Sequence, residues 1–419
     1  MDRILITGGG ALNGVVRIHG AKNSALKLMA AALLGDQPLE LANMPDLADT
    51  RFMAHLLRHL GVKVTSEGTH MRLDASAMGE PYAPYDLVRK MRATFNVLGP
   101  LLVRHGKARV SLPGGCAIGA RPVDAHLKAL TAMGAHIDLD EGYAVASAPD
   151  GLHGAHISFP FVSVGATEHA MLAAVLAHGQ TILENAAREP EIADLANCLN
   201  AMGAQVHGAG SSRIVIDGVR ALGGARHKVV PDRIEAGTYA LAVAATGGDV
   251  CIAHCVPDHL GALWERLQAA GVIIEPQSDH CVRIARGGGR CRAVDIETRP
   301  WPGFATDLQA QFMAVMACAE GASIIRETIF ENRFMHAPEL VRLGADITVH
   351  GHDAVVRGVT GLHGAPVMAT DLRASVSLVI AGLAARGQTE ISRVYHLDRG
   401  FEGLERNLGA LGADIRRVS

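Results

Sequence analysis

One glycine-rich segment, LPGGCAIGARPVD at residues 112–124, combines a thiol with a guanidinium group. Cys116 lies among three glycines, and Arg121 follows five residues later. Glycine lets the backbone turn sharply and approach a ligand closely. A thiol beside a cation is more readily ionised and more reactive, whereas a free cysteine that only packs is usually a small buried residue. A polar, glycine-rich loop is a poor place to bury one, so the segment predicts a reactive cysteine.

A second set of polar residues stands where alanine-rich helices should begin. Helix N-termini present free N–H groups and the positive end of the dipole, which suits phosphate and carboxylate. Guanidinium groups bind both anions through two parallel hydrogen bonds. The set, with the loop arginines that would join it, comprises Lys22, Asn23, Arg92, Arg121, Ser163 to Thr167, Arg233, Glu235, Asp307, Arg333, Asp371, Arg373 and Arg399. These cations exceed what one carboxylate needs, so we expect two anionic ligands.

Asp307 opens the segment TDLQAQ and is a candidate general base, with capping of that helix as the competing role. Glu189, Glu235 and Glu331 lie near these cations in the sequence and can equally form structural ion pairs between repeats. The chain has no GxxxxGK[ST] motif, which disfavours nucleoside triphosphate hydrolysis. The residue types favour a transferase or lyase with a reactive cysteine.

The elements that must position these residues form six repeats. A signature of a large residue, glycine, a small residue, any residue and a β-branched residue, as in MGAHI and LGADI, ends an amphipathic helix six times. The glycines are 61, 134, 203, 271, 344 and 412, in steps of 73, 69, 68, 73 and 68 residues. Each glycine should cap a helix C-terminus before a strand. Each repeat also holds a helix that is apolar nearly all round, which is typical of a buried helix.

Each repeat therefore predicts a strand, a buried helix, a strand, an outer helix and two further strands. The paired strands imply mixed sheets, which excludes one doubly wound parallel sheet. A dinucleotide-binding domain is excluded as well, because GGGALNG near the N-terminus lacks the GxGxxG spacing and leads into another strand. We expect an α/β fold of two globular domains with three repeats each, buried helices inside and sheets outside.

Composition limits the partners. The 419 residues are 49% hydrophobic and only 4% aromatic, with a formal net charge of −3, so nucleic acid is not expected. The seven cysteines include no CxxC pair, which favours a reducing cytoplasm over a disulfide framework. Cys251, His254, Cys255 and His259 match no standard zinc spacing, so no metal is expected. The N-terminus lacks a signal peptide pattern, and the apolar run 374–385 is too short to span a membrane.

The chain resembles the enolpyruvyl transferases of the EPSP synthase superfamily, and in particular their peptidoglycan branch. The resemblance runs from end to end. It is carried by GAKNSAL at 20–26, APYDLVRKMRA at 83–93, LPGGCAIGARPVDAHL at 112–127, ENAAREPEI at 184–192, VPDRIEAGT at 230–238, TDLQAQF at 306–312, FENRFMH at 330–336, ATDLRAS at 369–375 and YHLDRGF at 395–401.

The resemblance implies a two-domain inside-out α/β barrel with the active site in the inter-domain cleft. Residues 21–229 would form one domain, and residues 1–20 with 230–419 the other. It also implies transfer of the enolpyruvyl group of phosphoenolpyruvate to the 3′-hydroxyl of UDP-N-acetylglucosamine, with release of phosphate, as the first committed step of peptidoglycan synthesis. Those two small molecules are the partners implied, without cofactor or metal.

The same resemblance assigns roles to individual residues. Cys116 would protonate the methylene carbon of phosphoenolpyruvate and can hold a covalent adduct with it, while Asp307 would accept the proton of the sugar hydroxyl. Lys22, Arg121 and Arg399 would bind the phosphate. The Cys116 loop would close over the ligands and exclude water. The full set of implied substrate-binding residues is Lys22, Asn23, Arg92, Arg121, Pro122, Val123, Asp124, Ala125, Phe161, Val162, Ser163, Val164, Asp307, Ile329, Arg333, Asp371, Arg373 and Arg399.

Two positions depart from the pattern of the family. Phe161 stands where many relatives carry a lysine toward the nucleotide, and Asn96 stands where a large apolar residue is usual. A different uridine nucleotide as acceptor therefore stays open. The shikimate-pathway branch is disfavoured by the cysteine loop, and a non-catalytic UDP-sugar-binding paralogue is the remaining alternative.

Overall fold

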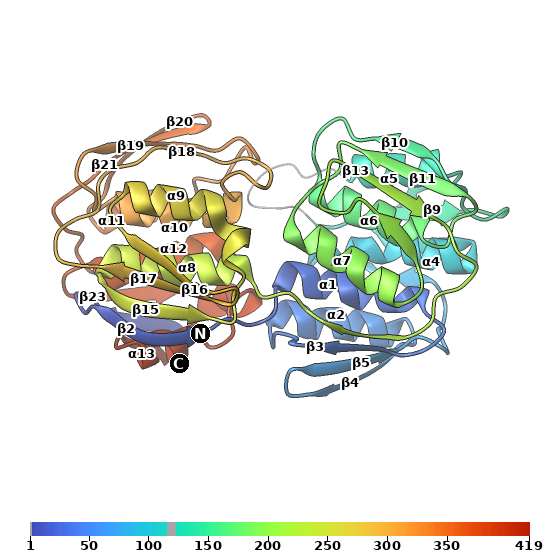
Figure 1. Cartoon of the computed structure of the whole chain (residues 1–419), viewed down its shortest axis with the longest axis horizontal. Helices are drawn as coiled ribbons and strands as arrows, with labels where there is room; N and C mark the ends of the chain where they lie inside the picture. Colours follow the sequence, from blue (N-terminus) through green and yellow to red (C-terminus); the bar gives the residue numbers. More distant parts are fainter. Residues whose placement is uncertain (1, 115–122) are drawn as a thin grey trace. The chain divides into compact units, whose positions relative to one another are not determined.

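The computed structural model describes residues 2–114 and 123–419. Their contacts divide the chain into two compact units. The first unit joins the N-terminal residues up to His19 with Pro231–Ser419, and the second holds the described residues between Gly20 and Val230. Each unit has its own hydrophobic core. Figure 1 shows the two sets of elements along the chain.

Three four-stranded sheets belong to the second unit, counted over its described residues. In each, the first two strands are parallel and the remaining pairs are antiparallel, which is the mixed pairing that the sequence predicts. Their strands, in sheet order, are β14 (Ala225–Lys228), β3 (Leu39–Ala42), β5 (His70–Asp74) and β4 (Lys63–Glu67); β6 (Tyr82–Ala83), β7 (Lys107–Ser111), β9 (Tyr143–Ser147) and β8 (His136–Asp140); and β10 (His156–Ser158), β11 (Gln180–Glu184), β13 (Arg213–Asp217) and β12 (Gln205–His207).

The described part of the first unit repeats this arrangement in three further sheets. Two of them take a strand from the N-terminal end of the chain, because β2 pairs with β15 and β1 lies between β23 and β24. The strands, in sheet order, are β2 (Leu12–Arg17), β15 (Gly248–Ala253), β17 (Cys281–Arg286) and β16 (Ile273–Ser278); β18 (Ile296–Glu297), β19 (Ala322–Arg326), β21 (Asp353–Arg357) and β20 (Asp346–His350); and β22 (Pro366–Met368), β23 (Gln388–Ser392), β1 (Arg3–Thr7) and β24 (Asp414–Val418).

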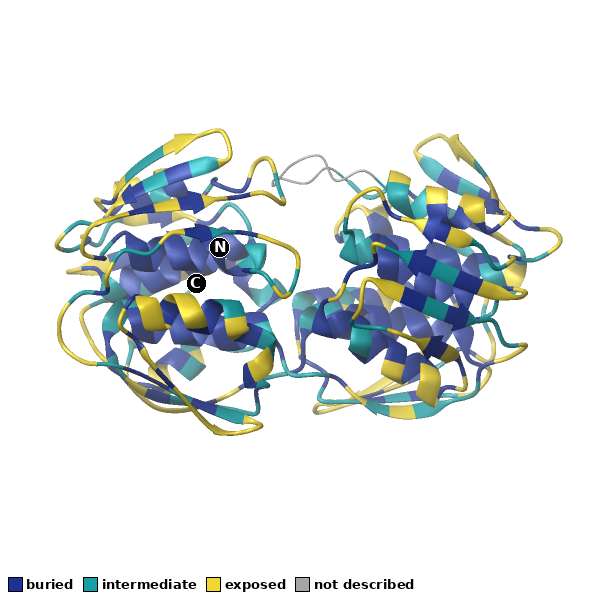
Figure 2. Cartoon of the chain, turned by 45° about the horizontal axis from the view of Figure 1, so that its top comes forward, coloured by how far each residue is buried: buried dark blue, intermediate teal, exposed yellow. Residues whose placement is uncertain are grey.

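The alanine-rich helices are buried on nearly every side. Figure 2 shows dark buried helices within each unit and exposed positions on the strands that surround them. Small and aliphatic residues all round these helices leave no polar face for solvent, so they form the centre of each core. They are α1 (Lys22–Ala31), α4 (Leu98–His105), α6 (Val164–Ala174), α8 (Arg233–Thr246), α10 (Gln309–Met316) and α12 (Leu372–Ala384). Short 3-10 segments adjoin four helices, at Ala32–Leu34, Arg92–Val97, Pro257–Leu260 and Thr306–Leu308, and a separate one covers Val394–Arg399.

The six repeat glycines confirm the expected helix ends. Each has a positive φ, from +90° at Gly61 to +106° at Gly203, which L-residues with a Cβ rarely adopt. Each follows an outer helix and precedes a strand of its repeat. The outer helices are α2 (Ala48–His59), α5 (Asp124–Ala132), α7 (Pro190–Ala201), α9 (Gly261–Ala269), α11 (Ala337–Arg342) and α13 (Leu404–Ala410); the short α3 (Tyr85–Val88) precedes α4.

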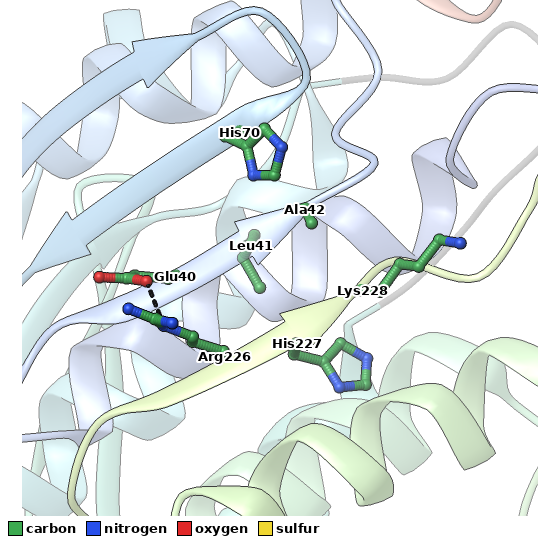
Figure 3. Close-up of a pocket in the computed structure, with 7 residues that line it drawn as sticks. All are labelled: Glu40, Leu41, Ala42, His70, Arg226, His227 and Lys228. Atoms are coloured by element: carbon green, nitrogen blue, oxygen red, sulfur yellow. Dashed lines mark ion pairs between the residues drawn. The ribbon is translucent and has the colours of Figure 1, made fainter.

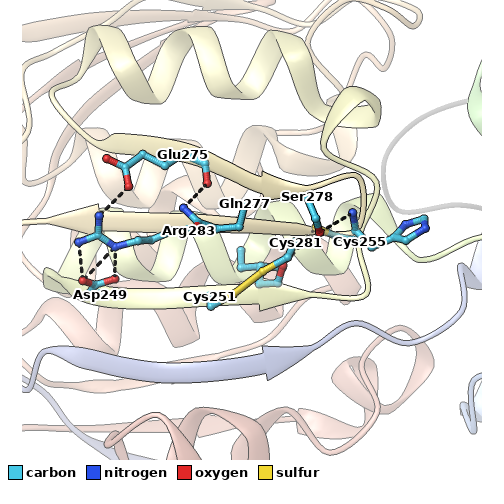
Figure 4. The surroundings of a disulfide bond; sticks show 10 residues. Asp249, Cys251, Cys255, Glu275, Gln277, Ser278, Cys281 and Arg283 are labelled. Atoms are coloured by element: carbon cyan, nitrogen blue, oxygen red, sulfur yellow. Dashed lines mark hydrogen bonds and ion pairs between the residues drawn. A yellow bond between two sulfur atoms is a disulfide. The ribbon is translucent and has the colours of Figure 1, made fainter.

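The expectation of reduced cysteines is wrong for Cys251 and Cys281, which form a disulfide between β15 and β17 (Figure 4). In this register Cys251 is opposite Arg283, and Ala253 is opposite Cys281. The two cysteines are therefore diagonal neighbours on one face of the sheet, 6.7 Å apart between Cα atoms, a proximity that spacing along the sequence does not reveal.

The α/β fold with mixed sheets around buried helices is the one that the repeats predict. Among the described residues, none of the helices has the length and apolar character that a membrane crossing requires.

Candidate active site

Asp307 lies between two arginines in the first unit. Arg333 donates from Nη2 to its Oδ1 at 2.6 Å, and Arg373 donates from Nη2 to its Oδ2 at 2.8 Å. Both arginines are only 7% exposed, whereas the Asp307 side chain is 25% exposed. The two guanidinium groups thus hold a reachable carboxylate in a fixed orientation. Phe330 covers one face of Arg333, with 5.0 Å between its ring centre and the Arg333 Cζ.

Asp307 is the second residue of the 3-10 segment Thr306–Leu308, whose N-cap is Ala305. Its two carboxylate oxygens face Arg333 and Arg373, and its expected roles as base or cap stay predictions. Asp371 is the residue that caps. It precedes α12 and accepts from the backbone N–H groups of Arg373 at 2.8 Å and Ala374 at 3.1 Å. The cap fixes the start of the helix that carries Arg373.

Histidines surround the same cluster. Burial lowers the pKa of His336 to about 4, with a further lowering by Arg333 that Asp371 opposes. Burial also lowers the pKa of His396, with Arg399 contributing in the same direction. Both rings are therefore neutral near pH 7, so the positive charge here resides on the arginines.

Two further predicted substrate-binding residues lie in the same unit. Arg399 ends the 3-10 segment Val394–Arg399, and Ile329 is 36% exposed beside Phe330.

Two residues of the Asp307 cluster, Thr306 and Glu327, are not among the site residues predicted from the sequence. Thr306 accepts from Arg333 Nη1 at 2.8 Å and donates to Glu327 Oε2 at 2.8 Å. Glu327 is 1% exposed. Thr306 is the first residue of the TDLQAQF motif, and Glu327 lies three residues before FENRFMH, but their contact joins segments about twenty residues apart in sequence. Only the fold brings these segments together.

In the second unit, Lys22 is the first residue of α1, and its Nζ lies 3.7 Å from Asp49 Oδ2. Ser24, in the first turn of the helix, donates to Asp194, which also accepts from His227 Nε2 at 2.8 Å. Asp194 therefore links the start of α1 to α7 and β14. Asn23 is half-buried beside Lys22, and Arg92 begins the 3-10 segment that leads into α4.

A pair of histidines joins α5 to α6. Gly99 donates its N–H to His169 Nε2 at 2.7 Å, so the ring proton of neutral His169 lies on Nδ1 and points at His126 Nδ1, 3.0 Å away. Burial lowers the pKa of His169 to about 3, with a smaller contribution from Lys27, which favours this neutral form. The contact holds the first turns of α5, where Asp124 and Ala125 lie after the N-cap Val123.

Residues 161–164 precede and begin α6. Ser163 caps the helix by accepting from Ala166 N–H at 3.3 Å, and Val164 is the first helical residue. Phe161 is 58% exposed, and Val162 is partly buried. Asn96 is buried and donates to the Gly165 carbonyl at 3.4 Å, so it ties the segment before α4 to this helix start.

Three predicted site residues, Cys116, Arg121 and Pro122, lie outside the described residues. The described ones fall into two groups that belong to different units. Asp307, Arg333, Asp371 and Arg373 are brought together by direct contacts or a shared helix start. The second-unit group is Lys22, Asn23, Arg92, Val123, Asp124, Ala125, Phe161, Val162, Ser163 and Val164.

Several acidic residues near the predicted cations bind other residues of the protein. Glu235 accepts from the backbone N–H of His19 at 2.9 Å and lies 3.0 Å from its Nδ1. Glu189 accepts from the adjacent Arg188 N–H at 3.0 Å. Asp398 binds Arg417 at 2.6 Å. The contacts of Glu189 and Glu235 are of the kind that the structural alternative left open by the sequence requires.

A cavity of about 340 Å³ lies elsewhere in the second unit, along β14, β3 and β5 (Figure 3). It is lined by Glu40, Leu41, Ala42, His70, Arg226, His227 and Lys228. Glu40 is paired with Arg226 at 2.8 Å and Arg72 at 3.1 Å. None of the described predicted site residues lines this cavity, which belongs to the ion-paired surface of a sheet.

Comparisons with known proteins agree over the whole chain. The model of the EPSP synthase (3-phosphoshikimate 1-carboxyvinyltransferase) family matches residues 6–408. The chain is 66% identical over 420 residues to UDP-N-acetylglucosamine 1-carboxyvinyltransferase of Maricaulis maris, covering 100% of this chain and 99% of that relative. It is 62% identical over 418 residues to the protein of the same name from Acidiphilium cryptum, covering 100% of both.

Solved structures are similar as well. The enolpyruvyl transferase NikO from Streptomyces tendae has a TM-score of 0.88 at 28% identity, covering 100% of this chain and 99% of that one. An EPSP synthase from Acinetobacter baumannii has a TM-score of 0.77 at 17% identity over the full length of both chains, a likeness of fold alone. The α/β fold expected from the repeats is confirmed by these neighbours.

Proposed function

The chain belongs to the EPSP synthase family of enolpyruvyl transferases, and from that membership we propose its reaction. It transfers the enolpyruvyl group of phosphoenolpyruvate to the 3′-hydroxyl of UDP-N-acetylglucosamine and releases phosphate, a step of cell-wall synthesis. The observation that carries this acceptor is the high identity, over the full length, to relatives named for it.

The reaction proceeds by addition and elimination. The sugar hydroxyl loses its proton to Asp307 and forms a bond to C2 of phosphoenolpyruvate, while C3 gains a proton. The intermediate then loses a proton from C3, and the C2–O bond to phosphate breaks. Asp307 suits the first proton transfer because it is partly exposed and held by two arginines, which leaves its orientation fixed as a substrate approaches.

Cys116 is the proposed acid toward C3 and the residue that can carry a covalent adduct. Lys22, Arg121 and Arg399 are the proposed phosphate ligands. Arg333 and Arg373, which both bind Asp307, are proposed to lie near the substrate carboxylate. Residues of both units take part in this proposal, which predicts that substitutions in either unit lower turnover.

The UDP-sugar would be bound through the second-unit group and through Asp307 and Ile329. Phe161 is the most informative residue of the second-unit group. It is exposed and apolar, and it stands where many relatives carry a lysine that would attract the nucleotide phosphates. A side chain that cannot pair with phosphate shifts the recognition of the nucleotide to the remaining cations. A modified preference among uridine nucleotides is therefore the second candidate function.

The test is phosphate release from phosphoenolpyruvate in the presence of one acceptor at a time. UDP-N-acetylglucosamine, UMP and shikimate 3-phosphate are supplied in parallel. Release with UDP-N-acetylglucosamine alone supports the proposal. Release only with another acceptor would keep the chemistry and overturn the acceptor. No release with any of the three, combined with binding of the UDP-sugar in calorimetry, would favour the non-catalytic paralogue.

A further inference from the structure

Glu327 is a buried carboxylate one residue beyond the end of β19, and it accepts four hydrogen bonds. Its Oε1 accepts from Thr298 Oγ1 at 2.9 Å and from the backbone N–H groups of Ile329 at 2.8 Å and Phe330 at 3.2 Å. Its Oε2 accepts from Thr306 Oγ1 at 2.8 Å. The two oxygens thus serve different segments: one holds the chain at Ile329 and Phe330, the other holds Thr306.

The contact with Thr306 fixes the direction of that hydroxyl. A hydroxyl has one proton and two lone pairs. Because the Thr306 proton is given to Glu327 Oε2, a lone pair of Thr306 Oγ1 faces Arg333, whose Nη1 donates to it at 2.8 Å. A hydroxyl that turned its proton toward Arg333 would oppose the Nη1 donor and would leave Glu327 Oε2 without the proton that it accepts.

Arg333 carries the constraint to the proposed base. Its two terminal nitrogens belong to one rigid plane, so fixing Nη1 on Thr306 also sets the position of Nη2. Nη2 donates to Asp307 Oδ1 at 2.6 Å. Arg333 is 7% exposed, and within its buried surroundings a rotation of the guanidinium plane would break both contacts.

We propose that Glu327 is a positioning residue for the reaction, acting on Asp307 through the Thr306 hydroxyl and the Arg333 guanidinium. Its carboxylate lies two hydrogen bonds from Arg333 and takes no direct part in the chemistry. The inference rests on the proposed function in so far as Asp307 is the base.

The replacement Glu327→Gln separates the two oxygens. The Gln carbonyl can keep the place of Oε1 and its three donors, which leaves the amide nitrogen facing Thr306. That nitrogen donates, so the Thr306 hydroxyl loses the acceptor of its proton and must offer lone pairs to two donors, which weakens its contact with Arg333 Nη1. The variant therefore retains the packing of the carboxylate and reverses only the hydrogen bond that orients Arg333.

The experiment is a double-mutant cycle on the full chain, with phosphate release as the readout. Glu327→Gln and Thr306→Val are each expected to lower kcat about 10- to 100-fold, with the KM of both substrates within about twofold. Thr306→Ser, which keeps the hydroxyl, is expected to stay near the parent kcat. In the Thr306→Val background, Glu327→Gln is expected to have little further effect, because the hydroxyl that transmits it is gone.

A matched control uses the other oxygen. Thr298→Val removes a hydrogen bond to Oε1 and is expected to lower the melting temperature with a smaller effect on kcat than Glu327→Gln. A parent-like kcat in Glu327→Gln would overturn the proposal. So would multiplicative effects in the double variant, because they would mean that Glu327 acts without Thr306.

A crystal structure of Glu327→Gln provides a readout independent of turnover. The expected result is a displaced Arg333 guanidinium whose Nη2 no longer contacts Asp307 Oδ1. An unchanged contact would overturn the proposal. Absence of phosphate release in the parent chain with every acceptor would instead count against the proposed function, and the crystallographic comparison would still decide the role of Glu327.

Discussion

Two buried guanidinium groups share one carboxylate at Asp307, and this arrangement sets what single substitutions do there. Arg333 and Arg373 have left bulk water, so each depends on an anionic partner in the protein. Asp307 supplies that partner while keeping part of its own surface open. The same residue thus serves the stability of the cluster and the proposed proton transfer.

Asp307→Asn is expected to lower the rate of phosphate release about 100- to 10,000-fold, because an amide cannot accept the hydroxyl proton. It should also lower the free energy of unfolding, by roughly 3–5 kcal/mol, since two buried cations lose their counter-charge. Steady-state kinetics and denaturant unfolding measure the two effects. Asp353→Asn is the control, because its ion pair with Arg326 is exposed. Turnover near that of the parent chain would remove Asp307 from the role of base.

His336 provides a pH dependence with a defined sign. Burial lowers its pKa to about 4, below the ordinary value of 6.5, so the unfolded chain binds more protons between these two values. Its contribution to stability is complete above about pH 6.5 and declines as the pH falls through about 4. The difference in unfolding free energy between the parent and His336→Gln should therefore shrink by about 2–3 kcal/mol from pH 7 to pH 4.5. Urea titrations at several pH values test this, and a difference that stays constant would contradict it.

Among the elements, the helix ends were the most predictable feature. Gly61 and the five glycines that correspond to it occur at a regular period, and a helix that ends in the left-handed region needs glycine wherever it occurs. Strand partners were less predictable. The mixed pairing follows from the order of elements within a repeat, but the disulfide between Cys251 and Cys281 depends on the register of β15 against β17.

The site was predictable in the same uneven way. Asp307, Arg333 and Arg373 lie in motifs with chemically informative residue types. Glu327 lies outside these motifs, and Thr306 lies in TDLQAQF without standing out, because a threonine at the start of a helix is common in any role. Only the three-dimensional contact shows that they bind each other.

Gly203→Ala is expected to lower the free energy of unfolding by about 1–2 kcal/mol, because a Cβ is disfavoured at positive φ. No atom lies within 4 Å of the added Cβ, so the cost comes from the backbone alone. Gly409 is the matched control: its Cβ also meets no atom within 4 Å, but it lies inside α13 without a positive φ. Gly409→Ala should be neutral or stabilising by up to about 1 kcal/mol. Equal effects at the two glycines in thermal unfolding would contradict the assignment of Gly203 as a helix cap.

At the scale of the whole molecule, each of the two cores is built largely from its own set of repeats. The N-terminal end does not pack with the repeats that follow it in sequence. Its strand β1 occupies an inner position in a sheet whose other strands come from the C-terminal end of the chain. Ile6 is fully buried there, opposite Thr389 and Ile415.

Ile6→Ala is expected to destabilise the first unit by about 2–5 kcal/mol, because it leaves a cavity between β1 and α12. In hydrogen exchange, amides of α12 and β23 should lose protection while those of α1 and α6 keep it. Val15→Ala is the control, since Val15 is 67% exposed, and it should change stability by no more than about 0.5 kcal/mol. Equal loss of protection in both units would contradict the independence of the two cores.

The position of β1 also bears on how the chain folds as the ribosome makes it. The strands of the second unit are all available once Val230 has emerged, whereas β1 finds its neighbours only in β23 and in β24, which ends at Val418. At about 5–20 residues per second, the N-terminal strand waits roughly 20–80 s for them. Throughout that interval an apolar strand without its sheet is exposed to other nascent chains. Folding of this half therefore waits for the last strand of its sheet, although β1 is synthesised long before the two strands that it pairs with.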